Sequence, residues 1–310
     1  MPGQLHLWPQ HRVAHGLSWS VSRARRLQDC PRKYYLYHHG AQGGGAADAP
    51  AEARELFILR SLKNRFMWVG EVVHELIELA LTHWSRGSGV SLEGLIDRGT
   101  RRMRAQYAES LQKLYRERPR RACGLFEHEY ALGLGREEWR RQRDRMELCL
   151  RNFYQLPLLE EIQDLPRWRW LALESGGSFE LDGAQVTVKP DFAFRDAAGR
   201  VVLVDWKTGK ARPEDEHLQL SIYGIYAKRS WGSGGAPLQA RAVHLEDASV
   251  TEYCLDNADL QAAEEMIRES LAEMRRLGEG GTGAPELSAF PKTDDTSRCT
   301  YCAFRRVCGR

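Results

Sequence analysis

The sequence of 310 residues lacks any long hydrophobic run and lacks a leader-like start. No apolar stretch approaches the roughly 18–20 residues that a helix needs to cross a bilayer. The opening segment, MPGQLHLWPQHR, has no charged stretch followed by an apolar one, which argues against a secretory leader. These two absences favour a cytoplasmic protein with no membrane partner.

Net charge is also nearly absent, because 45 Lys and Arg face 42 Asp and Glu. The sum of +3 argues against a strongly basic nucleic-acid-binding protein, but the charges are segregated. Residues 101–121 hold eight bases and two acids, and residues 21–33 hold five bases and one acid, whereas 246–277 hold nine acids and three bases. Each run fits a solvated helix face, yet such segregation also permits a basic groove for a polyanion.

Cysteine is scarce and odd in number, at seven residues. In a cytoplasmic chain this argues against a disulfide framework and favours free thiols or a metal site. Three cysteines stand close together near the C-terminus, at Cys299, Cys302 and Cys308. Three others share no motif spacing and are expected to be core thiols: Cys123, Cys149 and Cys254.

Hydrophobic periodicity predicts helices first and strands later. Apolar residues recur at helical spacing over 51–86, and amphipathic helices are expected at about 92–118 and 136–156. The period becomes strand-like over 168–206, and a helix is expected from Pro213 to about Ala227. Further strands are expected over 238–255 and a last helix over 258–277. This order predicts an α/β fold with an inserted helical lobe.

The segment QVTVKPDFAFRDAAGRVVLVDWKTGK (185–210) carries the sharpest chemical signal. Its middle, 196–199, has the composition of a type I turn followed by a left-handed glycine, so two strands pair around it. In that register Asp191 opposes Asp205, and Lys207 lies on the same face. Two carboxylates this close repel each other, and a divalent cation such as Mg²⁺ or Mn²⁺ relieves the conflict. The alternative is an ordinary salt bridge between Lys207 and one Asp.

These residues resemble the motifs of the PD-(D/E)XK nuclease superfamily, in its RecB-like branch, which includes the Cas4 nucleases. Pro190-Asp191 and Asp205-Trp206-Lys207 match the naming motif, and Asp205 to Gly209 match its Asp-x-Lys-Thr-Gly form. Gly70 and His74 match a Gly-x-x-x-His helix, and Gln219 and Tyr223 match a Gln-x-x-x-Tyr helix. The resemblance runs from about Ser18 to Cys308 and covers 90–165 poorly.

The resemblance implies a restriction-endonuclease-like core, with a central mixed sheet flanked by helices, an inserted helical lobe and a C-terminal cysteine tail. One domain over 1–310 is expected, divided into a cluster-ligand segment (17–50), a helical region (51–165), the nuclease core (166–278) and the tail (279–310). It also implies site roles. The metal ligands would be His74, Asp191, Asp205 and the backbone carbonyl of Trp206. The catalytic residues would be Asp191, Asp205, Lys207, Gln219 and Tyr223. Glu174 is an additional acidic candidate.

In the family that the sequence resembles, one cysteine before the core and three after it bind a [4Fe–4S] cluster. The matching residues are Cys30, Cys299, Cys302 and Cys308. Spacing alone leaves Zn²⁺ open as the less favoured occupant, because both groups take four thiolates. Basic residues flank these cysteines and are candidates for DNA contact: Arg23, Arg26, Arg32, Lys33, Arg305 and Arg306.

The function expected from the sequence is therefore a Mg²⁺- or Mn²⁺-dependent DNA nuclease. The resemblance favours an exonuclease on single-stranded ends, in DNA repair or recombination, CRISPR adaptation or anti-phage defence. The alternatives are a catalytically silent nucleic-acid-binding subunit, or a subunit that cuts only within a larger protein complex.

Overall fold

The computed structural model describes residues 16–210, 212–232, 237–281 and 283–310. Its strands are β1 (Ser18–Trp19), β2 (Trp170–Leu173), β3 (Gly177–Leu181), β4 (Ala184–Val188), β5 (Phe192–Arg195), β6 (Val201–Lys207), β7 (Leu238–His244) and β8 (Ser249–Leu255). Its longer helices are α1 (Val21–Asp29), α3 (Ala51–Leu59), α4 (Arg65–Ser85), α5 (Leu92–Leu111), α8 (Arg136–Gln155), α9 (Pro157–Asp164), α10 (Pro213–Trp231) and α11 (Asn257–Arg276). Short helical segments are α2 (Pro31–Tyr35), η1 (Leu36–Gly40), α6 (Leu114–Glu117), α7 (Phe126–Glu129), η2 (Arg167–Arg169), η3 (Leu287–Ala289), η4 (Thr296–Cys299) and α12 (Arg305–Cys308).

The central sheet is mixed and has the strand order β2-β5-β6-β7-β8. Only β6 and β7 run parallel, and the other neighbours are antiparallel. A second, three-stranded sheet has the order β1-β4-β3. The α/β class with mixed sheets flanked by helices is thus confirmed.

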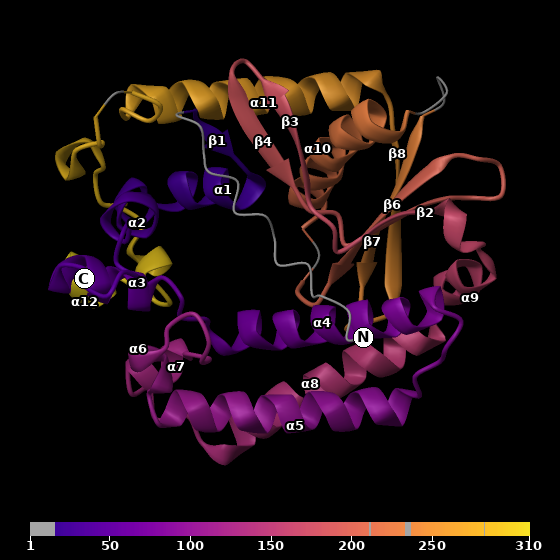
Figure 1. Ribbon diagram of the computed structural model, residues 1–310, viewed down its shortest axis with the longest axis horizontal. Helices are drawn as coiled ribbons and strands as arrows, with labels where there is room; N and C mark the ends of the chain where they lie inside the picture. The colour runs from indigo at the N-terminus through magenta and orange to yellow at the C-terminus, as the bar shows by residue number, and fades with distance from the viewer. Residues whose placement is uncertain (1–15, 211, 233–236, 282) are drawn as a thin grey trace.

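Both faces of the central sheet are covered by helices. On β6, Leu203 belongs to a core with α10 and α11, whereas Val202 and Val204 belong to a core with α4 and α8. The strand is therefore almost entirely buried, as its run of apolar residues requires. In Figure 1, α11 lies above the sheet and α4, α5 and α8 lie below it.

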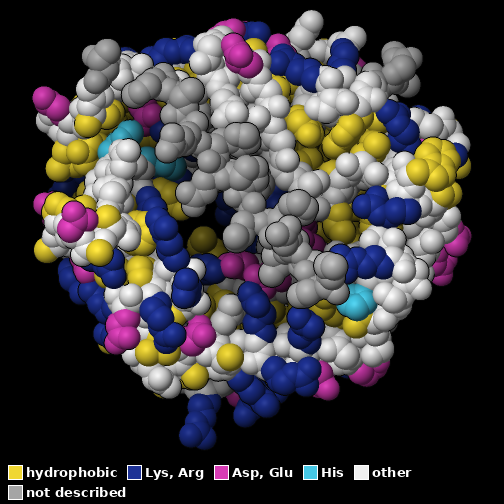
Figure 2. All heavy atoms as spheres, viewed as in Figure 1, with side chains coloured by type: hydrophobic (Ala, Val, Ile, Leu, Met, Phe, Trp, Pro, Cys, Tyr) yellow, Lys and Arg dark blue, Asp and Glu magenta, His cyan; other side chains and the backbone are white. Residues whose placement is uncertain are grey.

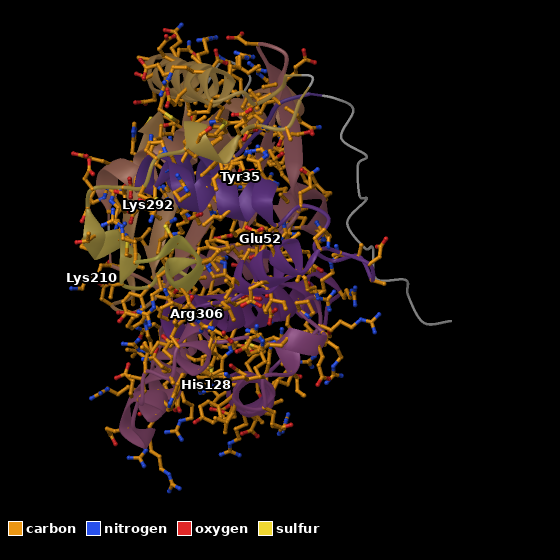
Figure 3. The ribbon with its side chains drawn as sticks, turned by 90° about the vertical axis from the view of Figure 1, so that its left-hand side faces the viewer. Tyr35, Glu52, His128, Lys210, Lys292 and Arg306 are labelled. Carbon is orange, nitrogen blue, oxygen red and sulfur yellow. The ribbon has the colours of Figure 1, made fainter. Side chains whose placement is uncertain are left out.

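The N-terminal helices and the C-terminal tail form the third side of the molecule. Their shared core includes Leu36, Phe57 and Leu59 from the N-terminal half and Cys302 and Phe304 from the tail. Figure 3 shows Lys292 and Arg306 of the tail on the same side of the molecule as Tyr35 of α2. In Figure 1 the N-terminal helices lie on the left, the central sheet lies on the right, and α4 runs below both.

Two expectations about elements need correction. The helix expected over 51–86 is two helices, because the chain turns at residues 60–64 and Asn64 accepts a hydrogen bond from the N–H of Met67 to start α4. Cys254 is exposed, whereas Cys123 and Cys149 are buried as expected. The composition of residues 231–237 (WGSGGAP) predicts a loop; α10 extends to Trp231, and residues 233–236 lie outside the described residues.

None of the described helices combines the length and the apolar character that a membrane span needs.

Candidate active site

The hairpin of β5 and β6 has the register that its turn predicts. Phe192 pairs with Val204 and Arg195 with Val201. Gly199 has a φ of +82°, and its N–H donates to the carbonyl of Asp196, so the left-handed position falls on the glycine. The turn chemistry alone therefore brings Asp191 and Asp205 to the same end of the hairpin.

Asp191 is buried and held by the neighbouring strand. Its carboxylate Oδ2 accepts a hydrogen bond of 2.7 Å from the backbone N–H of Trp206. The Trp206 ring is 2 % exposed and packs edge-on against Phe153 on α8 at 5.4 Å between centroids. The role expected for the Trp206 carbonyl stays a prediction, but its N–H and its ring fix the position of Asp191.

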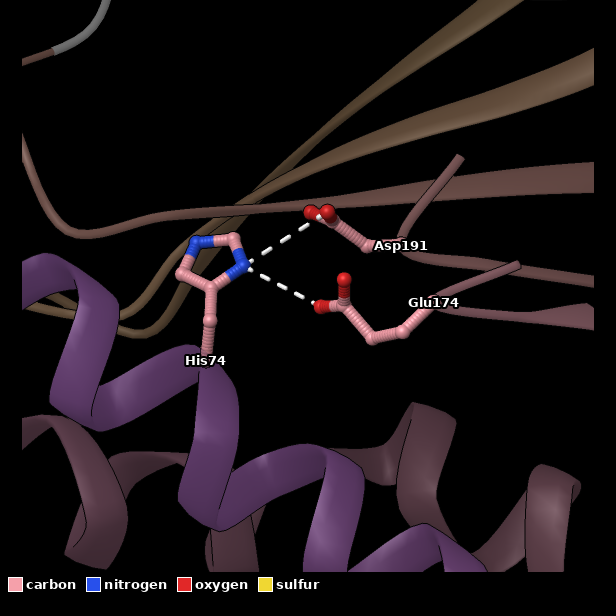
Figure 4. Close-up of side chains that lie close together, drawn as sticks. All are labelled: His74, Glu174 and Asp191. Carbon is pink, nitrogen blue, oxygen red and sulfur yellow. Dashed lines mark ion pairs between the residues drawn. The ribbon is translucent and has the colours of Figure 1, made fainter. Parts of the chain in front are cut away.

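His74 approaches the hairpin from α4. Val69, Val72 and Val73 are buried on this helix, which packs α4 against the sheet and turns His74 toward its end. The imidazole Nδ1 lies 3.5 Å from Asp191 Oδ1. Figure 4 shows the ring on α4 pointing at the two carboxylates from the sheet side.

The second of those carboxylates is Glu174, which follows β2. It lies 3.4 Å from His74 Nδ1, and Lys189 Nζ lies 2.6 Å from its other oxygen. Glu174 adopts a φ of +46°, which is uncommon outside glycine and costs energy. Its backbone N–H donates to the carbonyl of Asp191 at 2.8 Å, so the strained turn is tied to the site.

An ion pair and hydrogen bonds connect four side chains of the site: Lys207, Asp205, Gln219 and Tyr223. Lys207 Nζ lies 2.5 Å from Asp205 Oδ2 and donates to Gln219 Oε1 at 3.0 Å. The Gln219 amide nitrogen donates to Asp205 Oδ1 at 3.0 Å and to the Tyr223 hydroxyl at 2.8 Å. The predicted set is thus brought together, with Gln219 fastening α10 to the end of β6.

The helix that carries Gln219 is buried more broadly than its sequence pattern predicts. A stripe of Leu218, Ile222, Ile225 and Tyr226 is the expectation from helical spacing. Leu218 and Tyr226 are only partly buried, whereas Leu220 and Tyr223 are buried. The reason is that α10 lies between the sheet and α11, so more than one of its faces is covered.

Burial and neighbouring charges shift two pKa values in the site. Burial raises the pKa of Asp205 to about 7, and the nearby Asp191 carboxylate adds to the rise while Lys207 opposes it. At His74, burial lowers the pKa, but Asp191 and Glu174 outweigh it and raise the pKa to about 10. A divalent cation would relieve both shifts.

Three donors are close enough to share one ion. One ligand atom from each of His74, Glu174 and Asp191 lies within 4.8 Å of the others. Imidazole nitrogen with carboxylate oxygens suits Mn²⁺ or Mg²⁺. The expected ligand Asp205 lies outside this group and is engaged by Lys207 and Gln219.

The four cysteines at 30, 299, 302 and 308 lie around one small cavity. Its volume is about 140 Å³, and Lys33 and Phe304 also line it. The Cys30 sulfur accepts a hydrogen bond from the N–H of Lys33 at the start of α2. Arg298 fastens the tail beside Cys30, because it pairs with Asp29 at 3.0 Å.

The separation of the sulfurs limits what they could hold. Among the described residues, no three cysteine sulfurs lie within 4.8 Å of one another. Thiolates at about 2.3 Å from a tetrahedral zinc ion would lie about 3.8 Å apart. The four cysteines therefore line one cavity, although no three of their sulfurs lie within 4.8 Å of one another.

Five of the six basic residues expected to contact DNA have side-chain partners within the protein, and one of them is Arg26, whose guanidinium lies 2.9 Å from His38 Nε2. Arg23 donates to the Tyr34 hydroxyl at 2.7 Å and pairs with Glu279. Arg32 donates to the carbonyl of Phe290 at 2.7 Å.

The remaining residues of this set divide between the tail and a cavity. In the tail, Arg305 lies 4.2 Å from the centroid of the Tyr130 ring, and Arg306 pairs with Glu129 at 3.1 Å. Arg26 and Lys33 line a larger cavity beside α4.

A comparison with known families places these features in context. A model of the PD-(D/E)XK nuclease superfamily matches residues 18–309, nearly the whole chain. No curated protein matches the chain.

Proposed function

Because the chain belongs to the PD-(D/E)XK nuclease superfamily, we propose that it is a Mg²⁺- or Mn²⁺-dependent deoxyribonuclease acting at the site of His74, Glu174, Asp191, Asp205 and Lys207. Membership of the superfamily establishes a metal-dependent nuclease that binds nucleic acid. The observation that supports activity at this particular site is the cluster of His74, Glu174 and Asp191 donors within 4.8 Å, next to the ion pair of Lys207 and Asp205.

In the proposed reaction a water molecule attacks the scissile phosphorus and the 3′ or 5′ oxygen leaves. A divalent ion, when bound, would lower the pKa of a water molecule and offset negative charge on the phosphate. His74, Glu174 and Asp191 would hold that ion, with Asp205 beside them as the further ligand that the family motif implies. The N–H of Trp206 keeps Asp191 oriented throughout.

Lys207 serves as the cationic group next to the phosphate. Its ammonium would stabilise the negative charge that grows on the phosphoryl oxygens. Gln219 accepts a hydrogen bond from Lys207 and donates to Asp205, so it holds the two charges in register. Tyr223 is buried beside the site, and its hydroxyl accepts a hydrogen bond from Gln219.

The four-cysteine cavity is proposed to hold a [4Fe–4S] cluster. Four cysteines around one cavity of about 140 Å³, together with the resemblance of their order to the RecB-like branch, support this proposal. Such a group would join residue 30 to the last twelve residues and hold the tail against α2. The tail would then be a cluster-binding extension, and residues 90–165 a helical insertion in the nuclease core.

The substrate is proposed to be single-stranded DNA, degraded from its ends, in repair, recombination, CRISPR adaptation or defence. The support is the resemblance of the motifs to the RecB-like branch. Cleavage by the purified protein alone, in the experiment below, would exclude a dependence on a protein partner.

The experiment incubates the purified protein with linear and circular single-stranded DNA, with Mn²⁺, with Mg²⁺ and with EDTA. We expect the linear DNA to be degraded when Mn²⁺ or Mg²⁺ is present and the circular DNA to stay intact. Cleavage of the circular DNA would instead identify the protein as an endonuclease. The variants Asp205→Ala and Lys207→Ala should abolish cleavage while the fold and DNA binding remain.

Lys210→Ala is the matched control, because Lys210 is exposed three residues after Lys207 and takes no part in the chain of Gln219. This variant should cleave at the wild-type rate. Wild-type cleavage by both Asp205→Ala and Lys207→Ala would overturn the site assignment.

A further inference from the structure

A cavity with a strongly basic lining lies beside the start of α4. Its volume is about 720 Å³, and we call it the basic cavity. Seven Lys or Arg side chains line it against only Glu71 and Glu109. Figure 2 shows Lys and Arg gathered around a hollow in the middle of this face and along its lower left.

Most of these cations have no carboxylate partner. Within the described residues, Lys63 pairs with Glu71 and Arg102 with Glu75, whereas Arg60, Arg120 and Arg121 form no ion pair. Burial lowers the pKa of Arg60, and the nearby Arg120 lowers it further. An anion from outside the protein would therefore stabilise this set of charges.

Apolar side chains stand exposed at the rim of the basic cavity. Phe66 is 40 % exposed, Met67 is 60 % exposed and Tyr301 is 43 % exposed. The rings of Phe66 and Tyr301 meet edge to face at 6.5 Å, and Met67 and Tyr301 line the cavity itself. Cations beside an exposed aromatic surface match the two parts of an unpaired nucleotide, its phosphate and its base.

The basic cavity leads toward the candidate active site along α4. Met67, Glu71 and His74 lie on one face of this helix, because they are spaced four and then three residues apart. Seven residues of helix span about 10 Å, the length of about three nucleotides stacked at about 3.4 Å each. A strand with its scissile phosphate at His74 would reach the basic cavity within that distance.

Arg60 and Arg120 also line a second cavity, of about 740 Å³, beside the loop at residues 42–46. The positively charged surface therefore continues from the basic cavity into this second cavity. A nucleic-acid strand bound in the basic cavity could extend along it.

We propose that the basic cavity binds the sugar-phosphate backbone of single-stranded nucleic acid, starting about three nucleotides from the scissile phosphate. Phe66, Met67 and Tyr301 receive its unpaired bases. The position relative to the scissile phosphate rests on the proposed function, whereas binding in the cavity does not.

The test measures binding of a fluorescein-labelled oligothymidylate of 20 nucleotides in EDTA, so that cleavage cannot interfere. The double variant Arg120→Ala/Arg121→Ala removes two exposed cations of the cavity. We expect affinity to fall about tenfold or more and the slope of log affinity against log salt to fall by about two. Arg140→Ala/Arg143→Ala removes the same charge from exposed positions on α8 outside the cavity, and its affinity should stay unchanged.

A second variant separates nucleic acid from other polyanions. Tyr301→Leu removes the aromatic ring but keeps an apolar side chain, and it should weaken oligothymidylate binding about tenfold. Its salt slope and its binding of heparin should not change. Equal loss of both ligands would overturn the base contact, and displacement of the oligonucleotide by millimolar phosphate would reassign the cavity to a small anion.

The two proposals can fail separately. Unchanged oligonucleotide binding by Arg120→Ala/Arg121→Ala, in a protein that cleaves DNA, would overturn the cavity inference and leave the nuclease intact. Weakened binding by that variant, in a protein with no cleavage under any metal, would support the cavity and overturn the nuclease assignment.

Discussion

Gly70 on α4 lies directly against Thr208, the residue that follows Lys207. A Cβ added at position 70 would come within 2.8 Å of Thr208 Oγ1, closer than ordinary packing allows. The glycine four residues before His74 therefore sets how near α4 can approach the end of β6. The spacing of the Gly-x-x-x-His motif acquires a physical reason from this contact.

Gly70→Ala should lower cleavage about tenfold to a hundredfold without loss of thermal stability. The added methyl pushes α4 from Thr208 and shifts His74, and shifts of about 1 Å in such sites can cost a hundredfold in rate. Stability is spared because alanine favours a helix interior by about 1 kcal/mol over glycine. Cleavage rate and melting temperature measured on one preparation check this.

The rescue of that variant tests the same contact. Thr208→Ala removes Oγ1 and should cost little by itself, whereas Gly70→Ala/Thr208→Ala should regain most of the lost rate. A double variant as slow as Gly70→Ala alone would show that the contact is not the cause.

Glu174→Gln should weaken Mn²⁺ binding about tenfold or more, measured calorimetrically with the metal alone. The amide keeps the size of the side chain but loses the negative charge that faces His74. Glu180→Gln on the exposed part of β3 is the matched control. Equal Mn²⁺ affinity in both variants would remove Glu174 from the metal site.

Cys30→Ser and Cys302→Ser should lose iron and absorbance near 400 nm and should melt at lower temperature. Both positions are buried beside the four-cysteine cavity, so loss of the bound group frees the tail from α2. Cys254→Ser, which changes an exposed cysteine, should keep iron and stability. Stoichiometric zinc in a colourless wild-type protein purified without air would contradict the cluster.

His38 should make the fold less stable in mild acid. Burial, with Arg23 and Arg26 nearby, lowers its pKa to about 3, and its Nε2 lies 2.9 Å from the Arg26 guanidinium, which can only donate. The unfolded chain takes up a proton near pH 6.5 and the folded chain does not, so stability falls as pH drops from about 6.5 toward 3.

The variant His38→Gln should therefore lose part of this acid sensitivity. The measurement is the change in melting temperature between pH 7 and pH 5, compared with the wild type. His83→Gln at the end of α4, where the ring bonds only to Ser88, serves as the control. An identical pH response in wild type and His38→Gln would refute the assignment.

The hairpin of β5 and β6 could be predicted to the residue. Its register depends on four consecutive residues, 196–199, whose turn geometry is local. The start of α4 at Asn64 was harder to predict from the sequence. Apolar residues keep their helical spacing through residues 60–64, and only the Asn64 cap separates α3 from α4. The place of Gln219 and Tyr223 could be predicted as well, since residues four apart share a helix face.

Glu174 could be named from the sequence only as an additional acid, because it comes from a turn with no motif around it. Only the packing of β2 against β5 brings it to His74. The same holds for the basic cavity, which collects side chains from segments as distant as Arg26, Arg120 and Tyr301.

The sequence by itself determined the family, the hairpin register and most of the connected set of Asp205, Lys207, Gln219 and Tyr223, because these depend on residues near one another along the chain. The tertiary structure decided which acid completes the donor group, how four cysteines surround one cavity and which cations remain without partners. Those features depend on contacts between distant segments, and a nearly neutral total charge does not reveal them. The sum of +3 conceals a cavity with seven cations and two acids.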